Sequence, residues 1–101
     1  MGPEGRLLGA VHALLGKRKK AGDRIWWLKV HGGPAQRAGI PDLLICYLGR
    51  FLAVELKAGT KVSLIQQFEI DSINSAMGVA RVCTSTDDVE AVLHEIEDME
   101  P

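Results

Sequence analysis

Three charged residues in the middle of the chain have the types and spacing of a metal-dependent hydrolytic site. Asp42 follows Pro41, and Glu55 is separated from Lys57 by Leu56 alone. Two carboxylates that lie a few ångströms apart can bind one divalent cation between them. This pattern of two carboxylates and a lysine predicts a metal site if the backbone brings all three side chains to one face.

The segment that contains these residues reads as a β-hairpin. Two apolar runs flank Gly49-Arg50, and a leading glycine favours a two-residue type II′ turn. That turn would set Asp42 opposite Lys57 and Leu44 opposite Glu55. All three charged side chains would then share one face, with the backbones of Asp42 and Glu55 about 7–8 Å apart across a diagonal.

The rest of the hairpin is apolar on both faces, which predicts helices on both sides of the sheet. Charges on such a surface are costly unless they are paired or coordinated. A structural salt bridge from Lys57 to Asp42 or Glu55 is the simpler alternative. It would leave the negative charge of one carboxylate without a partner, and a bound cation would neutralise this charge.

Apolar periodicity and turn signals along the chain predict one α/β domain over residues 1–101, with the order helix, three strands, helix, strand, helix. The expected helices are residues 4–20, a segment that Ser63 opens and Gly78 ends, and a segment that Ser85-Thr86 caps. The expected strands are residues 25–30, the two arms of the hairpin and residues 79–83.

Two polar residues lie on the apolar stripes of the helices that flank the hairpin. Glu4 continues the leucine-rich stripe of the first helix, and Gln66 lies one turn before Ile70 in the second. Both side chains are therefore expected to point toward the sheet. Simpler roles stay open, because Glu4 can balance the helix dipole and Gln66 can complete a capping box with Ser63.

Charge is distributed unevenly along the chain. Residues 1–61 carry 11 Lys/Arg and 4 Asp/Glu, whereas residues 62–101 carry 1 and 9. A polyanion such as DNA is therefore the expected partner of the first part, although a basic run at residues 17–20 is equally typical of a solvated helix end. The candidate DNA contacts are Lys17, Lys20, Lys61, and His31 and Arg37 in the glycine-rich loop.

Composition excludes several classes of protein. With 47% hydrophobic and 25% charged residues, the chain resembles an ordinary soluble domain, and it has neither a signal peptide pattern nor an apolar run of bilayer length. Cys46 and Cys83 fall in expected core strands without a CxxC partner. Buried free thiols and a reducing cytoplasm, bacterial or phage-infected, are therefore expected, with no membrane and no small-molecule cofactor as partner.

The combined pattern resembles the PD-(D/E)XK nuclease superfamily and, in finer detail, its VRR-NUC family in the small stand-alone form of phage and bacterial genomes. The resemblance covers roughly residues 4–95. It is carried by an αβββαβ order with Glu4 in the first helix, Gly39 to Asp42 before the second strand, Val54 to Lys57 on the third, and Ser63 to Gln66 opening the next helix.

That resemblance implies a restriction-endonuclease-like core with a mixed four-stranded sheet flanked by helices, and hydrolysis of phosphodiester bonds in DNA with Mg²⁺ or Mn²⁺. It makes Asp42 and Glu55 metal ligands, with the Leu56 carbonyl as a further oxygen. Glu4 would complete the metal shell directly or through water. Hard oxygen ligands suit these two cations.

Supporting roles follow from the same resemblance. Lys57 would orient or help to deprotonate the attacking water, and Gln66 would help to position water or substrate. Stand-alone members of the family are associated with homodimers and with branched, Holliday-type DNA, which implies a role in DNA repair. Two alternatives remain open: a DNA-binding or assembly module that keeps the nuclease fold without turnover, and an unrelated small α/β protein with a structural ion pair.

Overall fold

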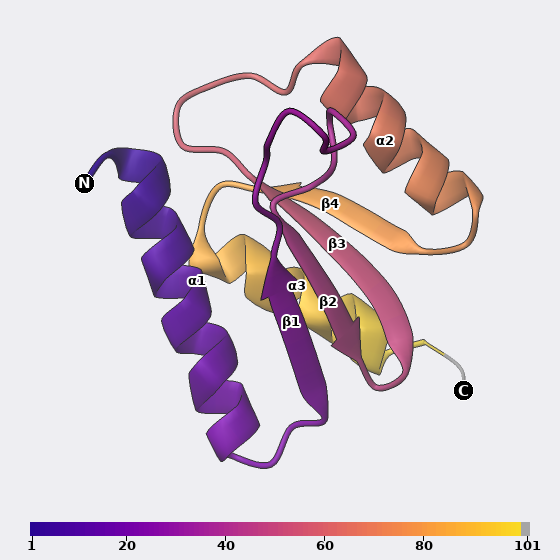
Figure 1. The fold of residues 1–101 in the computed structure, drawn as a ribbon. Coiled ribbons are helices and arrows are strands. Elements are labelled where there is room, and N and C mark those ends of the chain that lie inside the picture. The colour runs from indigo at the N-terminus through magenta and orange to yellow at the C-terminus, as the bar shows by residue number, and fades with distance from the viewer. Residues whose placement is uncertain (100–101) are drawn as a thin grey trace.

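The computed structural model describes residues 1–99 and has the expected order of helices and strands (Figure 1). In chain order these are α1 (Pro3–Lys20), β1 (Ile25–Lys29), β2 (Leu43–Tyr47), β3 (Arg50–Leu56), α2 (Leu64–Ser75), β4 (Val79–Cys83) and α3 (Thr86–Glu97). The strands form one sheet in the order β1-β2-β3-β4, antiparallel except for the parallel pair β3 and β4. The predicted mixed four-stranded sheet is confirmed.

Within residues 1–99 no helix combines the length and the apolarity that crossing a membrane requires.

Local sequence signals account for most helix ends. Pro3 occupies the first turn of α1, where its missing N–H is not needed. Ser63 caps α2 and Ser85 caps α3, as expected. α2 ends at Ser75 rather than near Gly78, because the chain already turns away at Met77, which has a φ of 74°.

The hairpin turn differs from the expected one. Its two loop residues are Leu48 and Gly49, with φ values of 53° and 77°, and Tyr47 pairs with Arg50. Two positive φ values are typical of a type I′ turn, whose twist matches that of the flanking strands. Leucine rarely adopts this conformation, so the turn rules favoured Gly49-Arg50 instead.

The register predicted from that turn was therefore wrong by two residues. Leu44 pairs with Ala53 rather than Glu55, and the pairing, continued past the end of β2, brings Asp42 level with Glu55 rather than Lys57. Side chains alternate with a period of two, so an offset of two leaves every residue on its predicted face. The two carboxylates are direct neighbours instead of diagonal ones.

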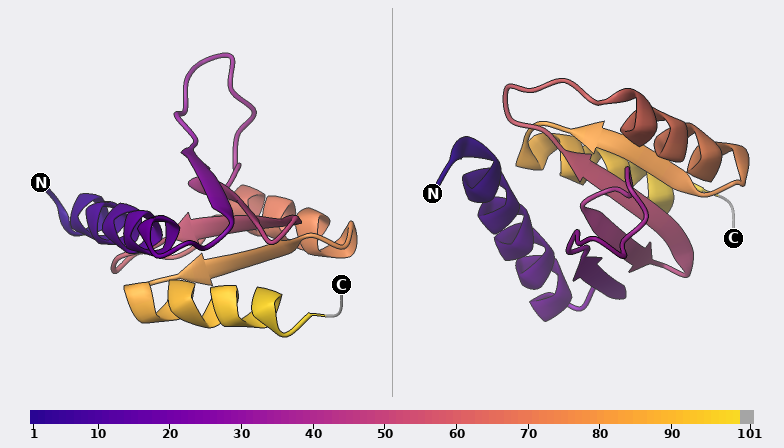
Figure 2. Two further views of the ribbon diagram at one scale, coloured as in Figure 1. Left: turned by 90° about the horizontal axis from the view of Figure 1, so that it is seen from below. Right: turned by 45° about the horizontal axis from the view of Figure 1, so that its top comes forward.

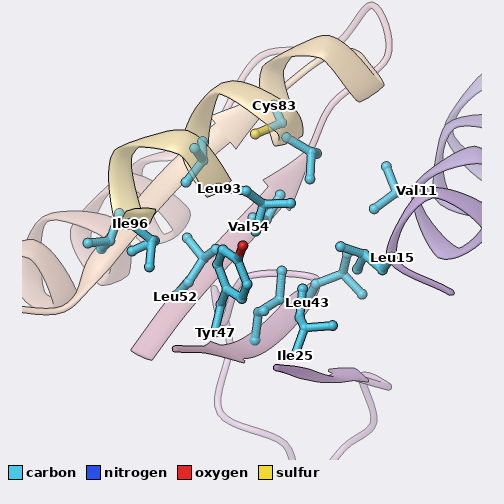
Figure 3. Packing of buried hydrophobic residues seen from close by; sticks show 14 of the residues in the cluster. Val11, Leu15, Ile25, Leu43, Tyr47, Leu52, Val54, Cys83, Leu93 and Ile96 are labelled. Atoms are coloured by element: carbon cyan, nitrogen blue, oxygen red, sulfur yellow. The ribbon is translucent and has the colours of Figure 1, made fainter. Parts of the chain in front are cut away.

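One face of the sheet carries the main core. α1 and α3 pack on this face, and their apolar side chains meet those of the strands (Figures 2 and 3). The residues of this cluster that are completely buried include Val11, Leu15, Leu43, Leu52, Val54, Val89 and Leu93. This core anchors the strands to α1 and α3 from one side of the sheet.

The opposite face is covered only in part. α2 packs over β3 and β4 through Ile70, which contacts Ala53 and Ala80. The prediction of helices on both sides of the sheet is confirmed, but α2 does not extend over β1 and β2. The prediction that Cys46 is buried was wrong. The uncovered apolar residues on this side are Trp26, Leu28, Cys46 and Phe51, which we call the open sheet face. Cys83, on the core side, is buried as expected.

A polar network fastens α1 to α3 at the end of the sheet away from Asp42. Arg18 binds Asp23 at 2.8 Å, Glu90 at 2.7 Å and Glu97 at 3.3 Å. Tyr47 donates its hydroxyl hydrogen to Glu97 at 2.6 Å. Arg18 is thus engaged by acidic groups of its own chain, and the basic run at residues 17–20 is partly neutralised.

This network predicts loss of stability in acid. The hydrogen bond from Tyr47, together with His94 and Arg18, holds the pKa of Glu97 at about 2, below its ordinary value of 4.5. A carboxyl with a depressed pKa stabilises the fold fully above the unfolded value and loses this contribution as the pH falls toward the folded value. Unfolding by urea between pH 6 and pH 2 should show a shallower decline for Glu97→Gln than for the wild type. Glu95→Gln, which lies on the same helix and pairs only with Arg81, should decline like the wild type.

Candidate active site

Asp42 is held rigidly at the point where three strands meet. Its carbonyl accepts a hydrogen bond from the N–H of Val30, and its Oδ2 accepts one from the N–H of Leu56, both at 2.8 Å. The first bond extends the pairing of β1 with β2, and the second ties the side chain to the end of β3. Pro41 precedes it and is itself buried, which fixes the approach of the chain. The orientation of the Asp42 carboxylate is therefore set by backbone groups.

Glu55 lies beside Asp42 and is only 2% exposed. Lys57 Nζ is 3.3 Å from its Oε2, and Gln66 Nε2 donates to the same oxygen at 3.0 Å. Burial raises the pKa of the Glu55 carboxyl above its ordinary value, and the negative charge of Asp42 adds to the rise, while Lys57 opposes it. The salt bridge considered from the sequence exists, but the repulsion between the carboxylates remains.

A divalent cation fits this pair by its chemistry. Among residues 1–99 no three His, Cys, Asp or Glu side chains come together as a metal cluster, so protein carboxylates would not enclose an ion completely. Mg²⁺ commonly uses one or two carboxylates and keeps several waters, and Mn²⁺ accepts the same oxygen ligands. The pair of Asp42 and Glu55 therefore suits a hydrated, hard cation and does not suit a closed zinc site.

Glu4 borders the site without completing it. It lines a hollow of about 160 Å³ with Lys29, Asp42 and Leu56, and its charge contributes slightly to the raised pKa of Glu55. Its side chain is exposed, so the expectation that Glu4 extends a buried stripe was wrong. The acidic group in the first turn of α1 therefore faces this hollow rather than the core.

Gln66 caps α2 and also points toward the sheet, where it contacts Glu55. Its Oε1 accepts from the N–H of Ser63 at 2.9 Å, which completes the capping box of α2. Its Nε2 binds Glu55, so the side chain points toward the sheet as expected. A single amide thus links the start of α2 to a buried carboxylate.

Lys29 is a site residue that the sequence analysis missed. It lies at the end of β1 and lines both the hollow beside Glu4 and a second hollow, of about 300 Å³, under the glycine-rich loop. Asp42 borders both hollows as well. The signal that could have revealed Lys29 is its position, because it is the charged residue that ends an otherwise apolar strand next to the loop before Asp42.

The expected DNA contacts are not gathered at one place. Lys17 and Lys20 are exposed at the far end of α1, about 20 Å from Glu4 by the rise of the helix. His31 and Lys61 are exposed in the loops that follow β1 and β3. Arg37 is bound to Glu69 of α2. A nucleic acid that touched all five residues would have to extend along α1 as well as over the site.

The αβββαβ core, with two neighbouring carboxylates and a lysine beside them, defines the restriction-endonuclease-like fold class. Neither a family model nor a curated protein matches the sequence. A solved structure described as a VRR_NUC domain aligns over 99% of this chain and 100% of its own, with a TM-score of 0.69 and 25% sequence identity. The chain has the VRR-NUC fold, and the family resemblance seen in the sequence is confirmed.

The double role of Gln66 can be measured through stability. Gln66→Ala removes one half of the capping box and a hydrogen bond to a buried carboxylate, so the free energy of unfolding should fall by about 1–3 kcal/mol. Gln67→Ala is the matched control, because Gln67 is exposed and binds only Asp71 of the same helix, and it should change stability by less than about 0.5 kcal/mol. Equal losses in urea unfolding would contradict the assignment.

Proposed function

We propose that this chain is a DNA endonuclease that depends on Mg²⁺ or Mn²⁺. Phosphodiester bonds of the DNA would be hydrolysed at the site that Asp42 and Glu55 form. The observation that carries the proposal is the buried Glu55 carboxylate, which lies beside a second carboxylate and within 3.3 Å of Lys57. Such an arrangement is unfavourable without a cation. The similar VRR_NUC domain supports a nuclease-type, DNA-processing domain.

Each side chain has a distinct task in this reaction. Asp42 and Glu55 would hold the cation, which when bound polarises the phosphate and lowers the pKa of a bound water. Lys57 is anchored by Glu55, so its ammonium group can orient the attacking water and offset negative charge that develops on the phosphate. Gln66 holds Glu55 in one orientation, and backbone N–H donation from Leu56 does the same for Asp42.

The hollow under the glycine-rich loop is the proposed entry for the DNA strand. Lys29, Gln36, Arg37 and Asp42 line it together with other residues of the loop. A lysine and an amide can bind phosphate oxygens, and glycines allow the sugar-phosphate backbone to approach closely. The strand would then pass Asp42 and continue toward Glu4.

A homodimer that acts on branched DNA is the finer part of the proposal. The open sheet face exposes Trp26 to 53%, Leu28 to 50% and Phe51 to 48%, and contiguous apolar surface of this kind commonly marks an interface. A twofold axis would bury the patch against its own copy and set two active sites in a fixed relation. Paired cuts in a four-way junction would follow from that symmetry.

The activity can be tested with Asp42→Asn, which removes the charge while it keeps an acceptor for the N–H of Leu56. Wild-type protein should cut supercoiled plasmid and a synthetic four-way junction with Mn²⁺ or Mg²⁺ and not with EDTA, and the variant should lose at least about 100-fold in rate. Asp71→Asn, a matched change of an exposed residue on α2, should retain full activity. Cutting in EDTA or by Asp42→Asn would refute the proposal. Salt-sensitive DNA binding without cleavage under any metal would support the non-catalytic module instead.

The oligomeric state provides a separate test. Trp26→Ser should shift the protein from dimer to monomer in analytical ultracentrifugation, because it removes the aromatic group with the largest exposed fraction on the open sheet face. Leu64→Ser is the control, since Leu64 is 91% exposed but lies on α2 rather than on the sheet. A wild-type protein that sediments as a monomer at high concentration would rule out this part of the proposal and leave the chemistry untouched.

A further inference from the structure

An ion pair joins the loop before Asp42 to helix α2. Arg37 donates from Nε to Glu69 Oε2 and from Nη2 to Glu69 Oε1, the second bond being 2.7 Å long. Two parallel bonds between a guanidinium and a carboxylate fix relative orientation as well as distance. The loop is therefore tied to α2 in a defined geometry.

Burial makes this pair a structural requirement for α2. The Glu69 side chain is only 7% exposed, whereas that of Arg37 is 68% exposed. Arg37 therefore reaches in from the surface and neutralises a carboxylate that the fold has taken out of water. Removal of the arginine would leave the buried Glu69 carboxylate without a compensating charge. This would strongly disfavour the packing of the loop on α2.

A second contact fixes the same loop on the same helix. Gly39 has a φ of +84°, and a Cβ atom at this position would lie 2.7 Å from the carbonyl oxygen of Ile65. The backbone of the loop thus lies directly against the first turn of α2, at a distance that only glycine permits. The loop is docked at two points, one ionic and one steric.

Arg37 and Glu69 both lie close in sequence to residues of the candidate site. Arg37 precedes Asp42 by five residues, and Glu69 follows Gln66 by three, on the same side of α2. Gln66 in turn holds Glu55. The pair therefore connects the loop that leads to Asp42 with the helix whose Gln66 holds Glu55.

We propose that Arg37 and Glu69 are positioning residues that set the separation of Asp42 and Glu55. The consequence for catalysis rests on the proposed function, whereas the consequence for geometry does not. In this view the guanidinium of Arg37 serves the site through Glu69, rather than as a direct phosphate contact as the sequence had suggested. Arg37 also lines the hollow proposed for the DNA strand, but its guanidinium is held by Glu69.

A double-mutant cycle tests the proposal with Arg37→Ala, Glu69→Gln and the combination of both. Calorimetric titration with Mn²⁺, in the absence of DNA, should show affinity about tenfold lower in each single variant, and the double variant should be no worse than either. Arg24→Ala, which removes an exposed arginine elsewhere, should bind Mn²⁺ like the wild type. Arg37→Lys should recover part of the loss, because it restores the charge without the two-pronged geometry.

Amide exchange of Leu56 gives a readout that needs neither metal nor DNA. Its N–H donates to Asp42, so its exchange rate should rise in Arg37→Ala and Glu69→Gln, while amides inside α3 stay protected and show that the variants are folded. Glu69→Gln avoids a buried unpaired charge and keeps the cycle interpretable if Arg37→Ala unfolds. Unchanged Leu56 exchange in both variants would overturn the proposal. If the wild type bound no Mn²⁺ but Leu56 exchange still rose, the nuclease assignment would fail and the positioning pair would stand.

Discussion

The proximity of two carboxylates at the buried end of the sheet is the constraint that the surrounding structure serves. Glu55 is almost fully buried beside Asp42, which is energetically costly because both groups are acidic. Three other groups around the two carboxylates reduce this cost. Lys57 supplies a positive charge, Gln66 supplies an amide donor, and the N–H of Leu56 binds Asp42. The core on the other face of β3 fixes the backbone from which these groups project. A site so arranged is preorganised, because its groups hold their orientation before any ligand arrives.

The identity of the residues on each face was predictable, whereas their pairing was not. Alternation of apolar and polar residues fixes which side chains share a face, and sliding two strands by two residues leaves that alternation unchanged. The choice between the two registers depended on the turn, where Leu48 adopts a conformation that leucine seldom takes. The sequence therefore predicted correctly that Asp42, Glu55 and Lys57 share one face, and it predicted an Asp42–Glu55 separation that was too large.

Contacts between distant segments account for the other differences. The strand pattern could not reveal that α2 covers only part of its face, so Cys46 was expected to be buried. Arg37 was taken for a DNA contact because its partner, Glu69, lies 32 positions later in the chain. Lys29 was overlooked because its place beside Asp42 depends on how β1 pairs with β2. In each case the missing information was three-dimensional packing, which residue spacing does not encode.

The location of α3 has a consequence for how a polyanion would approach. This helix carries Asp87, Asp88, Glu90 and Glu95, and it lies on the side of the sheet opposite to α2 (Figure 2). The sheet therefore separates this acidic helix from the side on which the carboxylate pair and the glycine-rich loop lie. Repulsion from α3 would disfavour encounters through this helix, whereas the basic end of α1 on the same side of the sheet would attract phosphates. The orientation of the molecule as it approaches DNA would thus depend on charges of both helices that lie away from the carboxylate pair.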